Sequence, residues 1–280
     1  MKNIFILSLL LISLSQIYTQ SATCCSAHDQ FAGLTTDMAF VNKHDEPIPF
    51  TYFSENGKMI TFQCPDGKMA NAFEIPAKKE SDDYLFVFHE WWGLNDYIKE
   101  VSEKFYTDLD KKVNVIAIDL YDGQVTARKD SAQTFMNSLN QERAISIIMG
   151  AINKAGPDAK VATVGWCMGG GFSLQASILL KSQGVACVMY YGFPETDKEK
   201  LKDLEADVLM IWPNQDKWIN NTVVTQFKTD MLSLNKNLKV EEYTADHAFA
   251  NPSNPKYNKE FADDAYSKSL IFLKSGFDMK

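Results

Sequence analysis

Short hydrophobic runs alternate along the chain with longer stretches in which apolar residues recur every three or four positions. Runs of this kind are typical of buried strands, and the longer stretches are typical of amphipathic helices. Their alternation predicts an α/β fold with a mostly parallel central sheet and helices on both faces. The predicted strands cover residues 84–88, 115–118, 161–164, 185–191 and 208–212, with a half-exposed last strand over residues 239–244.

Helices are predicted between these strands, and a hairpin is predicted before them. We take Asp96 as the N-cap of the first helix, which would bury Ile98, Val101 and Phe105 along one face. Residues 59–64 and 69–75 flank a Pro-Asp-Gly turn, which predicts an N-terminal β-hairpin. Further helices are expected around residues 131–138, 141–154, 172–179, 224–234 and 258–274.

The start of the chain has the layout of a secretory signal peptide. Lys2 precedes an apolar run over residues 4–12, which is too short to span a bilayer and ends in serines. We therefore expect a signal peptide over about residues 1–20 and a secreted or periplasmic protein. Residues 21–58 are expected to be an extension with little regular structure, and residues 59–280 are expected to form the α/β domain.

Composition narrows the range of partners. The 280 residues are 45% hydrophobic and 23% charged, as in ordinary globular proteins. The net charge of −8 argues against a nucleic-acid or anionic-membrane surface. We expect no nucleic-acid partner, no membrane contact in the mature form, and a monomer in preference to an oligomer.

The chain has five cysteines, so a secreted form would leave at least one thiol without an intramolecular partner. Cys167 is the natural candidate for the free thiol, and Cys187 lies in an apolar strand as a small buried hydrophobe. Cys24 or Cys25 could bridge to Cys64, although connectivity cannot be read from spacing alone.

Cys167 occupies the centre of a glycine-rich turn, Gly-Trp-Cys-Met-Gly-Gly-Gly, between a predicted strand and a predicted helix. This is the pattern of a nucleophile elbow, in which the central side chain stands above the sheet beside free N–H groups of the helix start. The positive end of the helix dipole there favours a thiolate. A buried structural cysteine beside a glycine turn is the alternative.

Three further polar residues follow strand ends, where functional groups of open parallel sheets gather. Glu90, Asp216 and His247 each come shortly after a predicted strand. The order nucleophile, acid, histidine is that of α/β-hydrolases. Singly, each residue could be a solvated acid, a turn residue or an ordinary hydrogen-bonding histidine, but all four together at strand ends favour a catalytic site.

Several segments give the chain a family resemblance from about residue 59 to residue 272. Residues 88–95 resemble the Glu-containing loop of the dienelactone hydrolase family, and residues 165–170 resemble its cysteine elbow. Matching segments follow in order at residues 119–123, 190–192, 214–216 and 246–249. The resemblance implies an α/β-hydrolase fold and hydrolysis of a small lactone or carboxylic ester, without metal or cofactor.

The family also implies roles for individual residues. Cys167 would be the nucleophile, and His247 and Asp216 would complete the triad. Glu90 would take the thiol proton when substrate binds, which keeps the resting thiol protected from oxidation. The backbone N–H groups of Met168 and Trp91 would form the oxyanion hole.

One position departs from the family pattern. Members that act on a carboxylated lactone hold its carboxylate with arginines, and Asn251 stands where one of them is expected; the other falls near Arg128, in a weakly matched region. We therefore expect a substrate other than dienelactone itself. Trp92 and Trp166, with Asn251, are expected to line an apolar pocket. A thioesterase or general carboxylesterase, and a non-catalytic binding module, are the alternatives.

Overall fold

The computed structural model describes residue 31 and residues 33–279. The expected signal peptide, Cys24 and Cys25 lie outside the described residues. Among those described, no helix has both the length and the apolar character needed to cross a membrane.

An eight-stranded sheet forms the centre of the molecule, in the order β1-β2-β4-β3-β5-β6-β7-β8. β2 runs antiparallel to β1 and β4, and the other neighbouring strands run parallel. The mostly parallel sheet and the N-terminal hairpin are thus confirmed. The strands are β1 (Lys58–Gln63), β2 (Met69–Ile75), β3 (Asp83–Phe88), β4 (Asn114–Ile118), β5 (Lys160–Trp166), β6 (Gly184–Tyr190), β7 (Asp207–Pro213) and β8 (Leu238–Tyr243).

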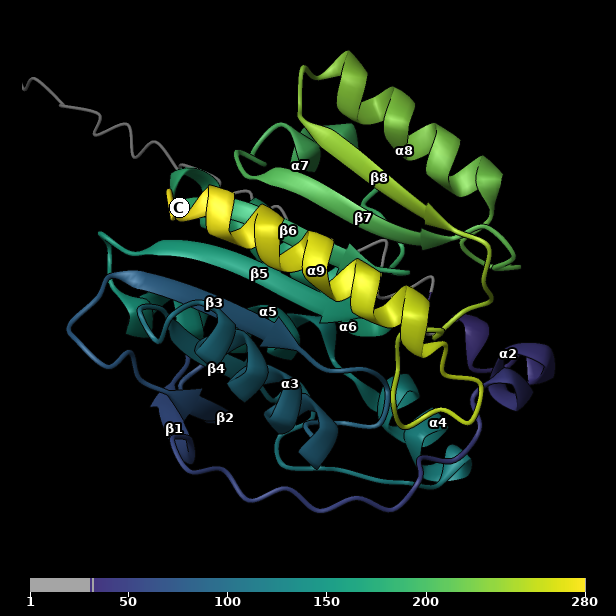
Figure 1. Ribbon diagram of the computed structural model, residues 1–280, viewed down its shortest axis with the longest axis horizontal. Helices are drawn as coiled ribbons and strands as arrows, with labels where there is room; N and C mark the ends of the chain where they lie inside the picture. Colours follow the sequence, from purple (N-terminus) through teal and green to yellow (C-terminus); the bar gives the residue numbers. More distant parts are fainter. Residues whose placement is uncertain (1–30, 32, 280) are drawn as a thin grey trace, which may run out of the picture.

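Helices cover both faces of the sheet, as predicted. α3 (Asp96–Asp108) and α9 (Lys259–Gly276) lie on one face, and α5 (Gln141–Ala155) and α6 (Met168–Leu180) lie on the other (Figure 1). α6 is buried along its whole length except for Leu179, because the sheet and α5 enclose it. The remaining elements are α2 (Met38–Lys43), α4 (Lys129–Ser138), η1 (Lys181–Gln183), α7 (Lys198–Leu201) and α8 (Asn221–Ser233).

One local prediction is wrong. Asn95, not Asp96, caps α3: its side-chain oxygen accepts from the Ile98 N–H at 3.2 Å, while Asp96 is the first helical residue and pairs with Lys99. Cys64 is a buried thiol, and its suggested partners Cys24 and Cys25 lie outside the described residues. The extension contains the helix α2, and residues 44–57 carry no helix or strand.

The described part of the extension crosses the molecule. α2 lies beyond the carboxyl ends of the parallel strands, and the chain then returns alongside α3 to β1 (Figure 1). Phe40 and Val41 of α2 are buried, and Asp37 caps the helix by accepting from the Ala39 N–H. Farther along, the hydroxyls of Tyr52 and Ser54 donate to Glu103 on α3. The extension is therefore anchored to the domain at both ends.

Candidate active site

Cys167 sits at a sharp turn between β5 and α6. Its φ of 55° and ψ of −122° place it in the left-handed region, which costs a non-glycine residue about 1–3 kcal/mol. Glycine is required on both sides, since a Cβ at Gly165 would lie 2.0 Å from the Gly169 carbonyl oxygen and one at Gly169 would lie 2.4 Å from that of Phe88. The glycines let β3, β5 and α6 approach closely enough to fix the turn.

The structure brings Cys167, His247 and Asp216 together from three strand ends. Nε2 of His247 lies 3.3 Å from Sγ of Cys167, and Nδ1 of His247 lies 2.6 Å from Oδ2 of Asp216. The other oxygen of Asp216 accepts from the backbone N–H groups of Trp218 and Ile219 at 2.9 and 3.1 Å. These two bonds hold the carboxylate still, and the carboxylate in turn orients the imidazole.

Burial and charge set the protonation states of these groups. Burial raises the pKa of the Cys167 thiol, more than His247 lowers it, so the resting sulfur is protonated. Burial would raise the pKa of Asp216, but contacts with His247 and two N–H groups outweigh it and lower that pKa. Burial would lower the pKa of His247, and the charge of Asp216 overcomes this and raises it. The result is a neutral thiol beside an oriented histidine ring whose protonated form is favoured.

Glu90 is buried next to this group but is not hydrogen-bonded to it. Its carboxylate accepts from the Tyr191 hydroxyl at 3.4 Å and from the Asn251 side-chain amide, and within the described chain no hydrogen bond joins it to Cys167. Burial raises the pKa of Glu90 to about 7, against a smaller lowering by His247 and Tyr191. A carboxyl with this pKa can exchange a proton near neutral pH.

Two backbone N–H groups are the expected oxyanion hole. The N–H of Met168 opens α6 and interacts with the Cys167 sulfur, lowering its pKa. The backbone N–H of Trp91 makes no hydrogen bond with the described residues. Helix-start donors of this kind can stabilise developing negative charge.

A cavity of about 590 Å³ lies between α3 and α9 and reaches Glu90. Trp166 and Asn251, two of the expected pocket residues, are among its lining residues, and Trp92 is not. Trp92 packs instead against Trp91, with ring centroids 4.9 Å apart. Arg128, near which the second arginine of the family falls, is exposed and pairs with Asp130 at 2.6 Å.

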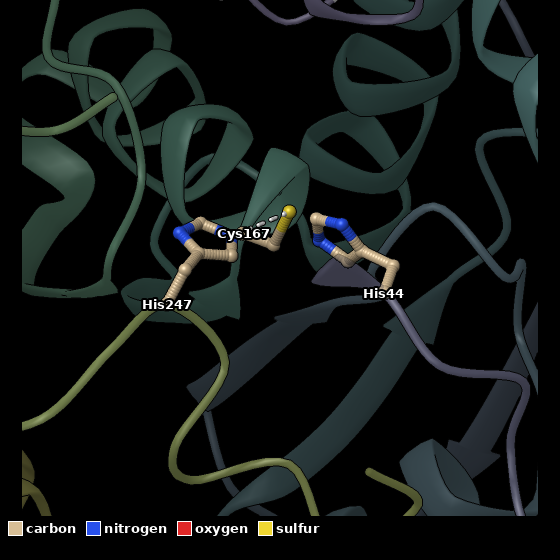
Figure 2. Close-up of side chains that lie close together, drawn as sticks. All are labelled: His44, Cys167 and His247. Atoms are coloured by element: carbon tan, nitrogen blue, oxygen red, sulfur yellow. Dashed lines mark hydrogen bonds between the residues drawn. The ribbon is translucent and has the colours of Figure 1, made fainter. Parts of the chain in front are cut away.

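His44 is the residue that the sequence analysis missed. Its imidazole lies on the opposite side of Cys167 from that of His247 (Figure 2). Nδ1 lies 2.9 Å from the Phe40 carbonyl oxygen, and Nε2 is buried without a hydrogen-bond partner. Burial and the nearby charge of His247 lower the pKa of His44 to about 3, so it is neutral. Its only signal in the sequence is its place shortly after the apolar run over residues 38–41.

Aromatic rings of the extension close the space around the thiol. The Phe40 ring packs against Trp218, Trp91 and His247, with centroid distances of 5.0, 5.9 and 5.9 Å. Lys43 adds an ion pair with Asp246, the neighbour of His247. Because of this packing, Cys167 is only 1% exposed.

Residues 72–277 match the model of the dienelactone hydrolase family. Protein usf of Aquifex pyrophilus is 26% identical over 233 residues, which cover 78% of this chain and 98% of the relative. Carboxymethylenebutenolidase 1 of Cupriavidus pinatubonensis is 21% identical over 208 residues, covering 69% of this chain and 86% of that protein. The family match begins after the extension that carries His44.

Solved structures show the same fold. A dienelactone hydrolase-like promiscuous phosphotriesterase from metagenomic libraries superposes with a TM-score of 0.65 at 18% identity, covering 79% of this chain and 98% of that one. An esterase from Pyrococcus furiosus superposes with a TM-score of 0.58 at 13% identity, covering 83% and 99%. With the observed strand order, these likenesses confirm the α/β-hydrolase fold.

Proposed function

Because the chain belongs to the dienelactone hydrolase family, we propose that it hydrolyses a small neutral ester or lactone with Cys167 as the nucleophile. The observation that carries the proposal is the contact series from Cys167 through His247 to Asp216, at 3.3 and 2.6 Å. A thiol beside an imidazole that a buried carboxylate orients is the arrangement required for nucleophilic acyl transfer. A relative named carboxymethylenebutenolidase agrees with hydrolysis of a lactone bond, although the substrate in its name carries a carboxylate.

The reaction proceeds in two steps. Sγ attacks the carbonyl carbon while the thiol proton passes to Glu90, whose pKa of about 7 suits a proton acceptor. The N–H groups of Met168 and Trp91 stabilise the oxyanion. The alkoxide then leaves with the proton that Glu90 took from the thiol, and a thioester remains. His247 then deprotonates a water molecule, which attacks the thioester and releases the acid and the thiol.

The charge of the neighbouring cavity argues for a neutral substrate. Five carboxyl residues and one lysine are among its lining residues, and no arginine is among them. Asn251 donates its amide to Glu90, so it supplies no positive charge for a substrate carboxylate. A carboxylated lactone would meet net repulsion there, since like charges in a partly buried site disfavour each other.

The same chemistry suits action outside the cytoplasm, which we propose from the signal-like start of the sequence. Thiolates are the form of cysteine that oxidises readily, and an oxidising compartment would inactivate a permanent thiolate. Burial keeps Cys167 protonated at rest by raising its pKa. The nucleophile would therefore be ionised only when a substrate is bound.

The test is the turnover of a panel: a p-nitrophenyl ester, a neutral lactone, a carboxylated dienelactone and an acyl thioester. We expect wild type to hydrolyse the neutral ester and lactone faster than the carboxylated lactone, and Cys167→Ala to show only background rates. Cys187→Ala, which removes another buried thiol, should retain activity. Equal rates in wild type and Cys167→Ala would contradict the proposal and favour a binding module, whereas a preference for the thioester would favour a thioesterase.

A further inference from the structure

Three potential ligand atoms surround one point in the site. Nε2 of His44, Sγ of Cys167 and Nε2 of His247 all lie within 4.8 Å of one another, and all three residues are buried. Figure 2 shows the sulfur between the two imidazoles, which come from opposite sides. Two nitrogens and one sulfur form a donor set typical of zinc and other thiophilic transition metals.

Hydrogen bonds through Nδ1 orient both imidazoles toward the thiol. Nε2 of His44 is already unprotonated, whereas His247, whose pKa is raised, must lose its Nε2 proton when a metal binds. The carbonyl of Phe40 can only accept, so Nδ1 of His44 carries the proton and Nε2 presents its lone pair. Asp216 binds Nδ1 of His247 in the same way. Metal-binding histidines almost always donate their second ring N–H to a carbonyl or carboxylate, which fixes the ring and its tautomer.

Nε2 of His44 makes no hydrogen bond with the described residues. It and the Trp91 indole nitrogen are the only buried side-chain polar atoms without a hydrogen-bond partner in the described chain. The rings of the two residues lie 4.6 Å apart, centroid to centroid. An unsatisfied buried polar group costs roughly 1–3 kcal/mol, and Nε2 of His44 makes no hydrogen bond even with the nearby Cys167 thiol. A ligand for His44 would remove this cost.

We propose that His44, Cys167 and His247 together bind a thiophilic divalent cation, with Zn²⁺ the best fit, and that the bound metal reversibly inhibits the enzyme. Zinc bonds of about 2.0–2.3 Å place tetrahedral ligand atoms roughly 3.3–3.6 Å apart. The separation of 3.3 Å between Cys167 and His247 already meets this requirement. His44 needs to approach by at most about 1.2–1.5 Å, which a rotation of its side chain provides.

Binding is balanced by proton release. Zn²⁺ replaces the thiol proton, the sulfur electron pair forms the S–Zn bond, and the proton leaves to solvent. Where Nε2 of His247 is protonated, that proton leaves as well. The metal then occupies the lone pairs of both the nucleophile and the imidazole, so neither can react. This inhibition rests on the function proposed above, whereas metal binding itself does not.

Because His44 belongs to the extension, the metal would also tie residues 33–57 to the domain. The family match begins at residue 72, so one of the three ligands lies outside the matched segment. Metal binding would therefore depend on the extension in a way that the matched domain alone cannot reproduce.

The experiment is a titration of the full mature chain with CoCl₂ in the absence of any ester. We expect one equivalent to produce a thiolate-to-cobalt charge-transfer band and tetrahedral d–d bands, which ZnCl₂ then abolishes by displacement. His44→Asn keeps a donor for the Phe40 carbonyl but has no Nε2, and should weaken cobalt binding at least about tenfold. Met38→Ala, an exposed change in the same helix, should bind cobalt as wild type does.

Two results would overturn the proposal: no thiolate-to-cobalt band in wild type, or equal cobalt affinity in wild type and a His44→Asn variant shown by circular dichroism to be folded. Zinc should also suppress ester turnover, and EDTA should restore it. A chain that hydrolyses esters but binds no cobalt contradicts only the metal site. A chain that binds cobalt but hydrolyses nothing contradicts only the proposed function.

Discussion

At the scale of single residues, the site contains a strained backbone position and buried ionisable side chains, both of which lower the stability of the folded chain. Cys167 holds a positive φ, which costs about 1–3 kcal/mol. Glu90 is 7% exposed, and within the described chain its side-chain partners are a hydroxyl and an amide rather than a cation. Asp216 and His247 are buried as a pair, which is stable only because each satisfies the other. Such concentrations of perturbed groups are typical of functional sites.

Glu90→Gln should change how stability depends on pH. The folded pKa of Glu90, about 7, lies above its ordinary value of 4.5. Between these values the unfolded chain ionises while the folded chain stays protonated, so wild-type stability falls as pH rises, by roughly 3 kcal/mol in total. The glutamine variant escapes this loss, so its unfolding free energy relative to wild type should be higher at pH 8 than at pH 5. Urea unfolding measures the difference, and parallel pH profiles would refute the assignment.

Asp216→Asn should reduce kcat by a factor on the order of 10³–10⁴, because an amide no longer fixes the tautomer of His247. The variant can still accept from Trp218 and Ile219, so the loop should keep its shape. Asp230→Asn is the matched control: this buried carboxylate of α8 pairs with Lys198 of α7 and has no contact with the triad. Steady-state kinetics compares the two, and similar losses in both would point to a general effect of burying an amide.

At the scale of elements, the sequence predicts what local pattern determines. Local sequence patterns predict the strands, the hairpin turn and the elbow. The strand ends in turn predict where Cys167, Asp216 and His247 lie. α2 and His44 were missed because tertiary packing of Phe40 stabilises a helix of only six residues. The packing of Trp92 against Trp91 could not be predicted from the sequence, because an aromatic residue beside a site can either pack against a neighbour or face a pocket.

Gly169→Ala should destabilise the elbow. The added methyl group would lie 2.4 Å from the carbonyl oxygens of both Phe88 and His89, so β3 and α6 must separate. Overpacking of this kind costs about 1–3 kcal/mol or more. Gly33→Ala adds the same methyl group with no atom within 4 Å and should be neutral or stabilising. The shift in urea midpoint distinguishes them, and equal midpoints would contradict the close packing.

At the scale of the whole molecule, the extension makes the site a closed one. Residues 33–57 run from α2, over the thiol, to β1, and the aromatic contacts of Phe40 link them to the loops that carry Trp91, Trp218 and His247. Substrate must therefore enter through the cavity that reaches Glu90 or through a local displacement of α2. Neither the length nor the composition of the extension indicated this closure.

Phe40→Ala should uncover Cys167. Loss of a buried ring removes about 3–5 kcal/mol of packing free energy. Each 1.4 kcal/mol by which the free energy of opening the extension falls raises the population of the open form about tenfold. Alkylation of Cys167 by iodoacetamide, followed by peptide mass spectrometry, should accelerate at least about tenfold. Phe53→Ala, in the same extension but 85% exposed, should leave the alkylation rate unchanged. Equal rates in Phe40→Ala and wild type would show that α2 does not restrict access.

The most direct test of the central claim is to trap the acyl-enzyme. Mature protein is mixed with p-nitrophenyl acetate and quenched in acid within a turnover, and the modified peptide is identified by mass spectrometry. The account predicts a burst of p-nitrophenol and an acetyl group on Cys167, with neither in Cys167→Ala. Turnover with the acetyl group on another residue, or with the same burst in Cys167→Ala, would contradict it.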